Sequence, residues 1–282
     1  MSILAIDIGG TKFTLALFEG GRMTRRESHA TDREQGREWM LGRIAGILAD
    51  WKGIDACGIG FGGPVDFPGQ RVALSTHVGG WQDFPLSQYV QDLLGVPTIM
   101  DNDANVGALG EADHLAKGGA GGVLPLFYVT LSTGIGGGLI LGDGSVYRGA
   151  DSWAGEIGHL TVQPEGPECL CGARGCLERM CSGLWLERDY GRSARELMQD
   201  PGFVERYVVN LALGLKAAIM LINPARIVLG GGIAKAGDAL LVPLRAELGR
   251  RMTAWSGARV EVVTAQLGDD SVLWGAAALA TS

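Results

Sequence analysis

The sequence predicts an α/β protein with two lobes and a cleft between them. Short apolar strands alternate with segments of helical periodicity along most of the chain. The order strand, glycine turn, strand and hairpin occurs twice, from residue 3 and again from residue 126, which indicates a duplicated topology. A glycine-rich joint at residues 117–122 separates the two copies. We therefore expect lobes of residues 1–117 and 118–282, with a last helix at about 270–282 packing back on the first lobe.

The first lobe opens with a buried strand that ends at Asp7 and returns through a glycine turn. Gly20 and Gly21 supply the next hairpin turn, because glycine adopts positive φ angles at no steric cost. Apolar residues then recur with helical spacing in three segments. Strands are expected at residues 3–7, 13–18, 23–29, 55–61 and 97–100, and helices at about 33–51, 85–94 and 104–115.

The second lobe repeats that opening and then becomes mainly helical. Its first strand is followed by a glycine turn at 132–138 and a hairpin turn at 142–144. Asn223 and Pro224 end a long apolar helix, because proline cannot continue one. Strands are expected at residues 126–131, 139–141, 226–229 and 260–264, and helices at 204–222, 239–252 and 271–279.

The shares of hydrophobic and charged residues are typical of a soluble globular protein, whereas 46 glycines are more than usual. Of the 282 residues, 46% are hydrophobic and 20% are charged, which allows a full core. The net charge of −7, without a basic stripe, argues against nucleic acid as a partner. The sequence has no apolar run of membrane length and no signal-peptide pattern, and its clustered thiols are typical of a reducing compartment. We expect a cytoplasmic protein that binds neither nucleic acid nor a membrane.

Two glycine turns are candidates for phosphate binding. The turns at residues 8–12 and 132–138 each lie between two strands, where glycine lets backbone N–H groups converge on an anion. Two such turns in two similar lobes could grip a polyphosphate, and the glycine triplet at 230–232 could offer a surface to an adenine. The alternatives are plain tight hairpins and, for the triplet, close packing. Asp7 suits either a carboxylate near phosphate-bound Mg²⁺ or a turn carboxylate that accepts local N–H groups.

The Asp-Asn-Asp sequence at residues 101–103 ends a strand and precedes a helix. Taken alone, it is most simply a helix N-cap. Beside a polyphosphate it gains a second interpretation, since phosphoryl transfer to an alcohol needs a carboxylate that accepts the hydroxyl proton. Asp103 is then the candidate base, and Asn102 can hydrogen-bond a neighbouring hydroxyl. Glu111 is expected to be a solvated carboxylate on the helix that follows.

Three of the five cysteines lie within eight positions, with a histidine ten residues upstream. This set matches a closed, tetrahedral Cys3His zinc site, which is structural because no coordination position stays open. A zinc-bound histidine is a poor general base, which favours Asp103 for that role. Cys57 and Cys181 fall outside the spacing and are expected in the core. The expected zinc ligands are His159, Cys169, Cys171 and Cys176.

These motifs together resemble the ROK family (repressors, open reading frames and kinases), and within it the bacterial glucokinase-like sugar kinases. The resemblance covers nearly the whole chain. It implies the actin-like, ribonuclease-H-like fold, whose two lobes close on sugar and ATP, and a homodimer or homotetramer. It rests on residues 7–12, 102–103, 132–138, 155–159 and 230–232 and on the Cys-x-Cys-x4-Cys-x-Glu pattern of residues 169–178.

The resemblance also implies roles for individual residues. Asp103 would be the catalytic base, and His159 would contact the sugar as well as the zinc. The glycine turns would bind the phosphates of ATP with its Mg²⁺. The implied sugar-binding residues are Gly63, Thr76, His77, Asn102, Asp103, Glu156, His159 and Glu178. The implied ATP-binding residues are Asp7, Gly9, Gly10, Thr11, Lys12, Thr133, Gly134, Gly136, Gly231 and Gly232.

One position departs from the family pattern. Many family glucokinases carry an asparagine where this chain has His77, in a loop that borders the sugar site. Glu156 favours a glucose-like ligand. The expected activity is ATP-dependent phosphorylation of the primary hydroxyl of a hexose, with glucose as the first candidate. N-acetylmannosamine, N-acetylglucosamine, fructose and allose stay open as substrates, and polyphosphate stays open as a donor.

The rival from another class is a sugar-sensing regulator without catalysis. Regulators of the family carry an N-terminal helix-turn-helix segment. Here the first phosphate motif begins at Asp7, so no such segment is expected. The presence of both phosphate turns also favours the kinase.

Overall fold

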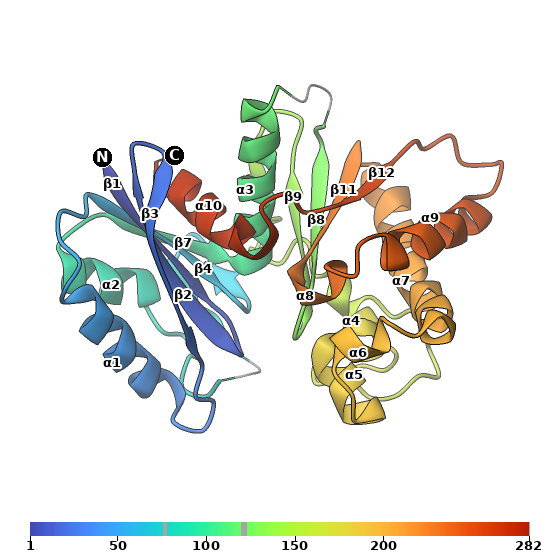
Figure 1. The fold of residues 1–282 in the computed structure, drawn as a ribbon, viewed down its shortest axis with the longest axis horizontal. Coiled ribbons are helices and arrows are strands. Elements are labelled where there is room, and N and C mark those ends of the chain that lie inside the picture. The colour runs from blue at the N-terminus through green and yellow to red at the C-terminus, as the bar shows by residue number, and fades with distance from the viewer. Residues whose placement is uncertain (76–77, 120–122, 282) are drawn as a thin grey trace. The chain divides into compact units, whose positions relative to one another are not determined.

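The computed structural model describes residues 1–75, 78–119 and 123–281, which form two compact units, each built on a five-stranded sheet (Figure 1). Unit 1 consists of residues 1–114, 148–154 and 270 onward, and unit 2 of residues 115–147 and 155–269. The chain therefore changes unit four times, at 114/115, 147/148, 154/155 and 269/270. The segment 148–154 carries no signal in the sequence pattern that would assign it to unit 1.

The sheet of unit 1 has an antiparallel half and a parallel half. β1 pairs antiparallel with β2 and parallel with β4, and β4 pairs parallel with β7. The carboxyl ends of β1, β4 and β7 therefore meet at one edge of the sheet. The strands are β1 (Ser2–Ile8), β2 (Lys12–Glu19), β3 (Arg22–Ala30), β4 (Ala56–Phe61) and β7 (Thr98–Asn102), in the order β3-β2-β1-β4-β7.

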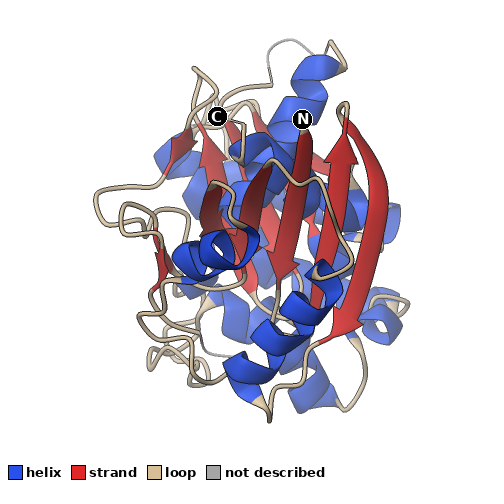
Figure 2. Cartoon of the chain, turned by 90° about the vertical axis from the view of Figure 1, so that its left-hand side faces the viewer, coloured by secondary structure: helices blue, strands red, loops and turns tan. Residues whose placement is uncertain are grey.

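Helices pack against both faces of this sheet. Alternate residues of β1 point to opposite faces, and both sets are apolar, so each face has a core to cover. Leu4, Ile6 and Ile8 share a core with α1 and α2, whereas Ala5 packs with α3 and α10. Figure 2 shows the long strands of this sheet with helices beside them. The helices are α1 (Gly36–Leu48), α2 (Leu86–Leu94), α3 (Asp103–Lys117) and α10 (Ser271–Leu279).

Glycines allow α10 to approach β4 and α3 closely. A Cβ at Gly58 would lie 1.9 Å from the carbonyl oxygen of Ala276, and a Cβ at Gly275 would lie 1.7 Å from that of Val106. Any larger residue at these positions would force the backbones apart. The C-terminal helix is therefore part of the core of unit 1.

The contact between α3 and α10 corrects one expectation. Glu111 is fully buried rather than solvated, and its Oε1 accepts a hydrogen bond from Ser271 Oγ at 2.7 Å. The spacing of α3 alone could not reveal that α10 covers this face. A buried carboxylate with a hydroxyl partner is satisfied rather than exposed.

The sheet of unit 2 repeats the order of the first. Its first strand pairs antiparallel with the second and parallel with the fourth, as in unit 1. The duplicated topology and the α/β fold class predicted from the sequence are therefore confirmed. The strands are β8 (Leu126–Leu131), β9 (Ile135–Ile140), β10 (Val146–Tyr147), β11 (Arg226–Gly230) and β12 (Glu261–Thr264), in the order β10-β9-β8-β11-β12.

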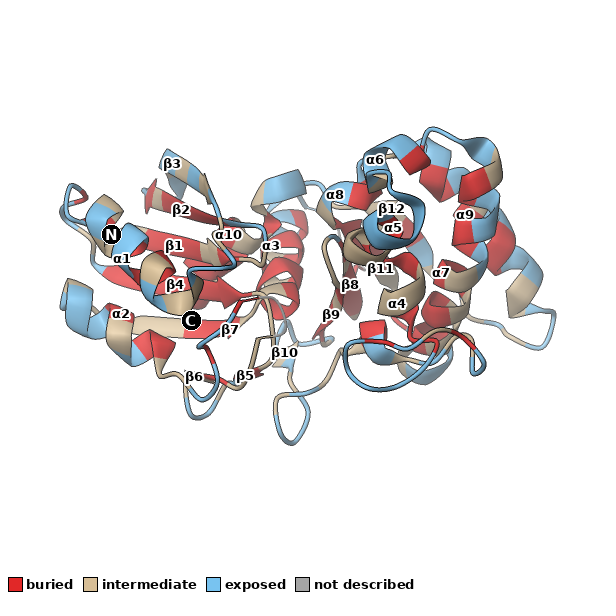
Figure 3. Ribbon diagram, turned by 90° about the horizontal axis from the view of Figure 1, so that it is seen from below, coloured by how far each residue is buried: buried red, intermediate tan, exposed pale blue. Residues whose placement is uncertain are grey.

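The long helix α7 (Pro201–Ile222) supplies much of the core of unit 2, and its buried residues lie along one side (Figure 3). It starts three residues before the expected position, because Asp200 caps the N–H groups of Gly202 and Phe203 at 3.0 and 3.3 Å. The other elements are β5 (Val65–Asp66), β6 (Arg71–Val72), α4 (Leu177–Cys181), α5 (Gly183–Tyr190), α6 (Ala194–Leu197), α8 (Gly231–Ala234), α9 (Asp238–Met252) and the 3-10 turns η1 (Ile157–His159) and η2 (Gly268–Asp270). Among the described residues, no helix has the length and apolarity needed to cross a membrane.

The predicted glycine turn at 132–138 is shorter than expected. Ser132 N–H donates to the carbonyl of Gly134 at 3.0 Å, and β9 begins at the next residue. Gly136 therefore lies in a strand, not in a turn. Gly137 lies there for a packing reason, since its Cβ would fall 2.7 Å from the ring of Phe127.

Candidate functional site

In unit 1 a tight turn joins β1 to β2. Gly9 N–H donates to the carbonyl of Lys12 at 2.9 Å, and a Cβ at Gly9 would lie 3.0 Å from that oxygen. Thr11 and Lys12 are exposed, and Gly9 and Gly10 are half-buried. The turn therefore offers a glycine backbone with a hydroxyl and an ammonium group beside it, which is suitable chemistry for an anion.

Residues after β3 hold this turn from the carbonyl side. Thr31 Oγ1 donates to the carbonyl of Gly9 at 3.0 Å, and Arg33 Nε donates to that of Gly10 at 2.7 Å. The N–H of Thr31 donates to the carbonyl of Thr11 at 2.9 Å. Thr31 and Arg33 were not predicted from the sequence, and no local signal marks them, because their partners lie some twenty residues away.

Asn102 is the N-cap of α3. Its Oδ1 accepts from the N–H of Ala104 at 2.9 Å, and its Nδ2 donates to the carbonyl of Gly63 at 2.9 Å. The simple N-cap interpretation of the Asp-Asn-Asp sequence therefore holds for Asn102. Gly63, one of the implied sugar contacts, is joined to β7 by the same side chain.

Asp103 is the first residue of α3, and its carboxylate lies beside the glycine turn. A Cβ at Gly62 would be 3.4 Å from Asp103 Oδ2 and also 3.4 Å from Cα of Gly9. The N–H of Gly62 donates to the carbonyl of Ile8 at 2.8 Å, which holds the ends of β4 and β1 together. Because residue 62 is glycine, the Asp103 carboxylate can lie close to the candidate phosphate turn at Gly9. Both belong to unit 1.

In unit 2 the turn after β8 is braced by the start of α5. The N–H of Gly183 donates to the carbonyl of Ser132 at 2.7 Å, and that of Leu184 donates to the carbonyl of Thr133 at 3.1 Å. Ser132 is exposed, whereas Thr133 and Gly134 are half-buried. As in unit 1, the carbonyl groups of the turn accept hydrogen bonds from a neighbouring segment.

Two glycines press the loop at 155–159 against β9. Gly155 has a φ of +89°, and its Cβ would lie 2.2 Å from the carbonyl oxygen of Gly137. A Cβ at Gly158 would lie 2.1 Å from the carbonyl oxygen of Ile135. Only glycine fits at either position. This contact fixes the backbone on both sides of Glu156.

The carboxylates of the two sugar motifs gather near the start of β9. Glu178 Oε2 accepts a hydrogen bond from the N–H of Ile135 at 2.9 Å. Glu156 Oε2 lies 4.0 Å from His159 Nε2. Burial raises the pKa of the Glu156 carboxyl, the nearby Glu178 carboxylate raises it further, and His159 opposes both. The structure thus brings Glu156, His159 and Glu178 into one unit.

The predicted metal ligands form a cluster. One ligand atom from each of His159, Cys169, Cys171 and Cys176 lies within 4.8 Å of the others. The Sγ atoms of Cys171 and Cys176 are 3.7 Å apart, and a tetrahedral zinc with Zn–S bonds of about 2.3 Å places its sulfurs about 3.8 Å apart. Burial and the neighbouring thiols of Cys171 and Cys169 raise the pKa of the Cys176 thiol to about 12, and a bound cation would stabilise its thiolate. The donor set therefore fits structural zinc.

Cys57 and Cys181 are fully buried outside this cluster, as expected. The glycine triplet at 230–232 has a packing role in two of its members. A Cβ at Gly230 would lie 2.0 Å from Tyr128 Oη, and one at Gly231 would lie 2.4 Å from the carbonyl oxygen of Leu131. Gly232 is exposed with open space around it. Thr76 and His77 lie outside the described residues.

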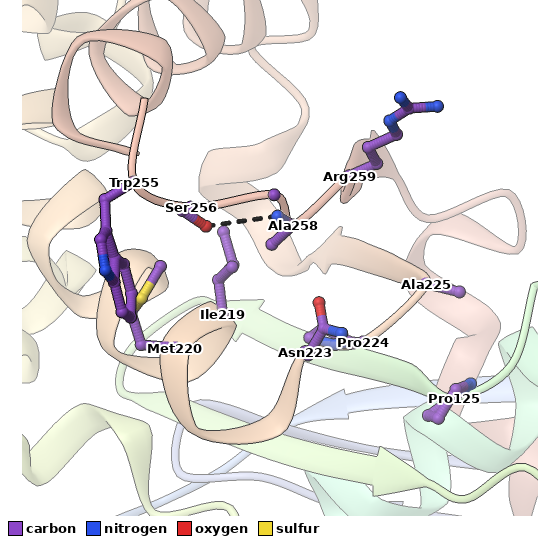
Figure 4. Close-up of a pocket in the computed structure, with 11 residues that line it drawn as sticks. Pro125, Ile219, Met220, Asn223, Pro224, Ala225, Trp255, Ser256, Ala258 and Arg259 are labelled. Atoms are coloured by element: carbon purple, nitrogen blue, oxygen red, sulfur yellow. Dashed lines mark hydrogen bonds between the residues drawn. The ribbon is translucent and has the colours of Figure 1, made fainter. Parts of the chain in front are cut away.

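A hollow of about 520 Å³ lies elsewhere in unit 2, between the end of α7 and the segment 255–259 (Figure 4). Met220 and the highly exposed Trp255 help to line it. Its lining contains none of the residues assigned to sugar, ATP or metal. The hollow is therefore separate from the candidate site.

Known proteins share this fold over their whole length. A ROK family glucokinase from Streptomyces griseus, solved with glucose and AMPPNP, is 28% identical with a TM-score of 0.85, covering 100% of this chain and 99% of that one. A ROK hexokinase from Thermus thermophilus is 34% identical with a TM-score of 0.80, covering 100% and 98%.

Curated relatives have three different functions. A glucokinase of Halalkalibacterium halodurans is 32% identical over 86% of this chain and 83% of its own. An N-acetylmannosamine kinase of Vibrio cholerae is 34% identical over 83% and 84%. A putative xylose repressor of Caldicellulosiruptor is 34% identical over 82% of this chain and 63% of its own.

The two matching sheets, with a glycine turn after the first strand of each, define the actin-like sugar kinase fold. A family model described as ROK family matches residues 3–282. The chain belongs to the ROK family.

Proposed function

We propose that this protein is an ATP-dependent hexose kinase, with glucose as the first candidate substrate. The observation that carries the proposal is the position of Asp103, whose Oδ2 lies 3.4 Å from where a Cβ at Gly62 would be, beside the Gly9 turn. A kinase acting on an alcohol needs a carboxylate next to its phosphate-binding backbone. The glucokinase relatives, and the glucose and AMPPNP bound to the Streptomyces griseus enzyme, support both substrates.

In this proposal Asp103 accepts the proton of the primary hydroxyl as the hydroxyl oxygen attacks the γ-phosphorus. The new O–P bond forms while the bond to the bridging oxygen of ADP breaks. Mg²⁺, when bound to the phosphates, neutralises charge, and Asp7 at the end of β1 is the candidate to hold it through water. Lys12 adds a positive charge at the first turn.

The candidate hexose contacts are Glu156, His159 and Glu178 in unit 2, and Asn102 in unit 1. Asn102 already donates one amide N–H to Gly63, so its second N–H is the one available to a sugar oxygen. Zinc, held by His159 and three cysteines, would have a structural role. It would fix the loop from residue 159 to residue 176, and Glu178 lies two residues after the end of that loop.

The test is ADP release in a coupled assay with a panel of glucose, N-acetylmannosamine, N-acetylglucosamine, fructose and allose, comparing kcat/KM. Asp103→Asn should lower kcat by about 10²- to 10⁴-fold while hexose affinity stays close to that of the wild type. Asp50→Asn, an exposed carboxylate just after α1, is the matched control and should be active. Normal turnover by Asp103→Asn would exclude Asp103 as the base.

A sugar-sensing regulator is the second candidate, favoured by the similarity to a putative xylose repressor. Sugar binding measured by calorimetry without ATP, compared with ADP release in the coupled assay, separates the two functions. A regulator would bind a sugar and release no ADP with any of the five hexoses. A kinase would do both with the same sugar.

A further inference from the structure

Arg148 is bound to the strand that leads to the candidate base. Its Nε donates to Asp101 Oδ2 at 2.7 Å, and its Cζ lies 3.5 Å from the centroid of the Phe67 ring. The Asp101 side chain is 3% exposed and that of Arg148 is 21% exposed. Asp101 Oδ1 accepts from the N–H of Asn102 at 2.7 Å and from Asn105 Nδ2 at 3.1 Å. Both carboxylate oxygens are therefore engaged, in a well-buried site.

The same arginine begins the segment 148–154, which belongs to unit 1 although the chain on either side of it belongs to unit 2. The N–H of Ala154 donates to the carbonyl of Arg148 at 3.0 Å, which closes the segment into a compact loop. Ser152 Oγ accepts from the N–H of Phe67 at 3.2 Å. Arg148 and Ser152 therefore both attach the loop to the rest of unit 1.

The chain returns to unit 2 directly after this loop, at the glycine that packs on Gly137. The next residue is Glu156, eight positions after Arg148. Asp101, the partner of Arg148, is two positions before Asp103. The segment that Arg148 anchors on unit 1 is thus followed directly in sequence by the loop that carries a candidate sugar carboxylate.

We propose that Arg148 is a positioning residue for the hexose, an inference that rests on the proposed kinase function. By pairing with Asp101, whose other carboxylate oxygen accepts from the N–H of Asn102, it holds the end of the strand that carries Asn102, a candidate sugar contact. Arginine suits this role because its planar guanidinium can donate to a carboxylate and stack on an aromatic ring at once. Arg148 itself touches no sugar in this scheme, so its loss should weaken hexose binding more than the chemical step.

The double variant Asp101→Asn/Arg148→Met tests the proposal, because it removes both charges and leaves no unpaired buried carboxylate. The expected result is a hexose KM, and a hexose Kd measured without ATP, raised on the order of tenfold to a hundredfold. The KM for ATP and the unfolding temperature should stay close to the wild-type values. Arg148→Lys keeps the charge but not the planar stack, so it should raise the hexose KM by a smaller factor.

The matched control is Arg226→Met/Glu261→Gln, which removes an ion pair of 2.5 Å at the starts of β11 and β12. It should leave both KM values unchanged. If the wild type is active and both the double variant and Arg148→Lys have the wild-type hexose KM, this inference alone is overturned. A wild-type chain that phosphorylates no hexose would overturn the proposed function, and this inference with it. If the double variant does not fold, the hexose KM of Arg148→Lys decides.

Discussion

The backbone N–H of Ile135 donates a hydrogen bond of 2.9 Å to Oε2 of Glu178. Ile135 is the first residue of β9, directly after the second glycine turn, and Glu178 lies in α4, two residues after the last cysteine of the metal cluster. A carboxylate assigned to the sugar is therefore bonded to the backbone that follows a turn assigned to phosphate. The candidate sugar site and the candidate phosphate turn of unit 2 are therefore joined by one hydrogen bond.

This bond predicts that Glu178→Ala weakens both substrates. A hydrogen bond to a charged group contributes roughly 1.5–3 kcal/mol, so the KM for hexose and the KM for ATP should each rise by about 10- to 100-fold. Glu178→Gln keeps an acceptor oxygen and should have a smaller effect on ATP. Steady-state kinetics with each substrate varied in turn is the measurement.

The control for Glu178 is Glu187→Ala, an exposed glutamate in α5. It should change neither KM. A Glu178→Ala enzyme in which only the hexose KM rises would show that the bond to Ile135 does not support the turn.

Removal of one metal ligand should abolish hexose binding without removing a sugar contact. Cys171→Ser loses a thiolate ligand, so the loop between His159 and Glu178 should lose its fixed geometry. We expect less zinc per chain by elemental analysis and no measurable hexose binding by calorimetry. Treatment of the wild type with a strong chelator should have the same effect, reversed by zinc.

Cys57→Ala is the matched control, because Cys57 is fully buried in β4 and outside the metal cluster. It should keep its zinc and its hexose affinity, with a modest loss of stability. A Cys171→Ser protein that binds hexose as tightly as the wild type would disprove a structural role for the metal.

The contact between α10 and α3 makes Gly275 sensitive to a single methyl group. A Cβ there would lie 1.7 Å from the carbonyl oxygen of Val106, so Gly275→Ala should destabilise the protein by about 1–3 kcal/mol. Thermal unfolding should show a midpoint several degrees lower. Gly42→Ala in α1 is the control, since its Cβ would have no neighbour within 4 Å, and it should stabilise by about 0.5–1 kcal/mol. Equal midpoints for the two variants would contradict the close packing.

Several features of this structure could be predicted from short stretches of the sequence. The buried strand at 126–131 was predicted with its observed ends, because a continuous apolar run between glycine-rich segments is a strong signal. The clustering of the four candidate metal ligands was also predictable, since all four lie within eighteen residues of one another. In both cases the information is contained in one short stretch.

Contacts between distant segments could not be predicted. Glu111 was expected in solvent, and only the position of Ser271, 160 residues later, explains its burial. Gly136 was assigned to a turn but lies in β9. Glycine occurs both in turns and where two backbones come close together, and the sequence alone does not distinguish the two. Arg148 carries no motif at all, and its importance appears only when Asp101 is seen beside it.

Unit 1 takes most of its residues from the start of the chain and α10 from its end. The N-terminal part of a protein leaves the ribosome first. Gly58 and Val106 nevertheless stay without the helix that covers them until Ser271–Leu279 have been made. All residues of unit 2 precede residue 270. The half of this protein that is synthesised first is therefore the half that is completed last.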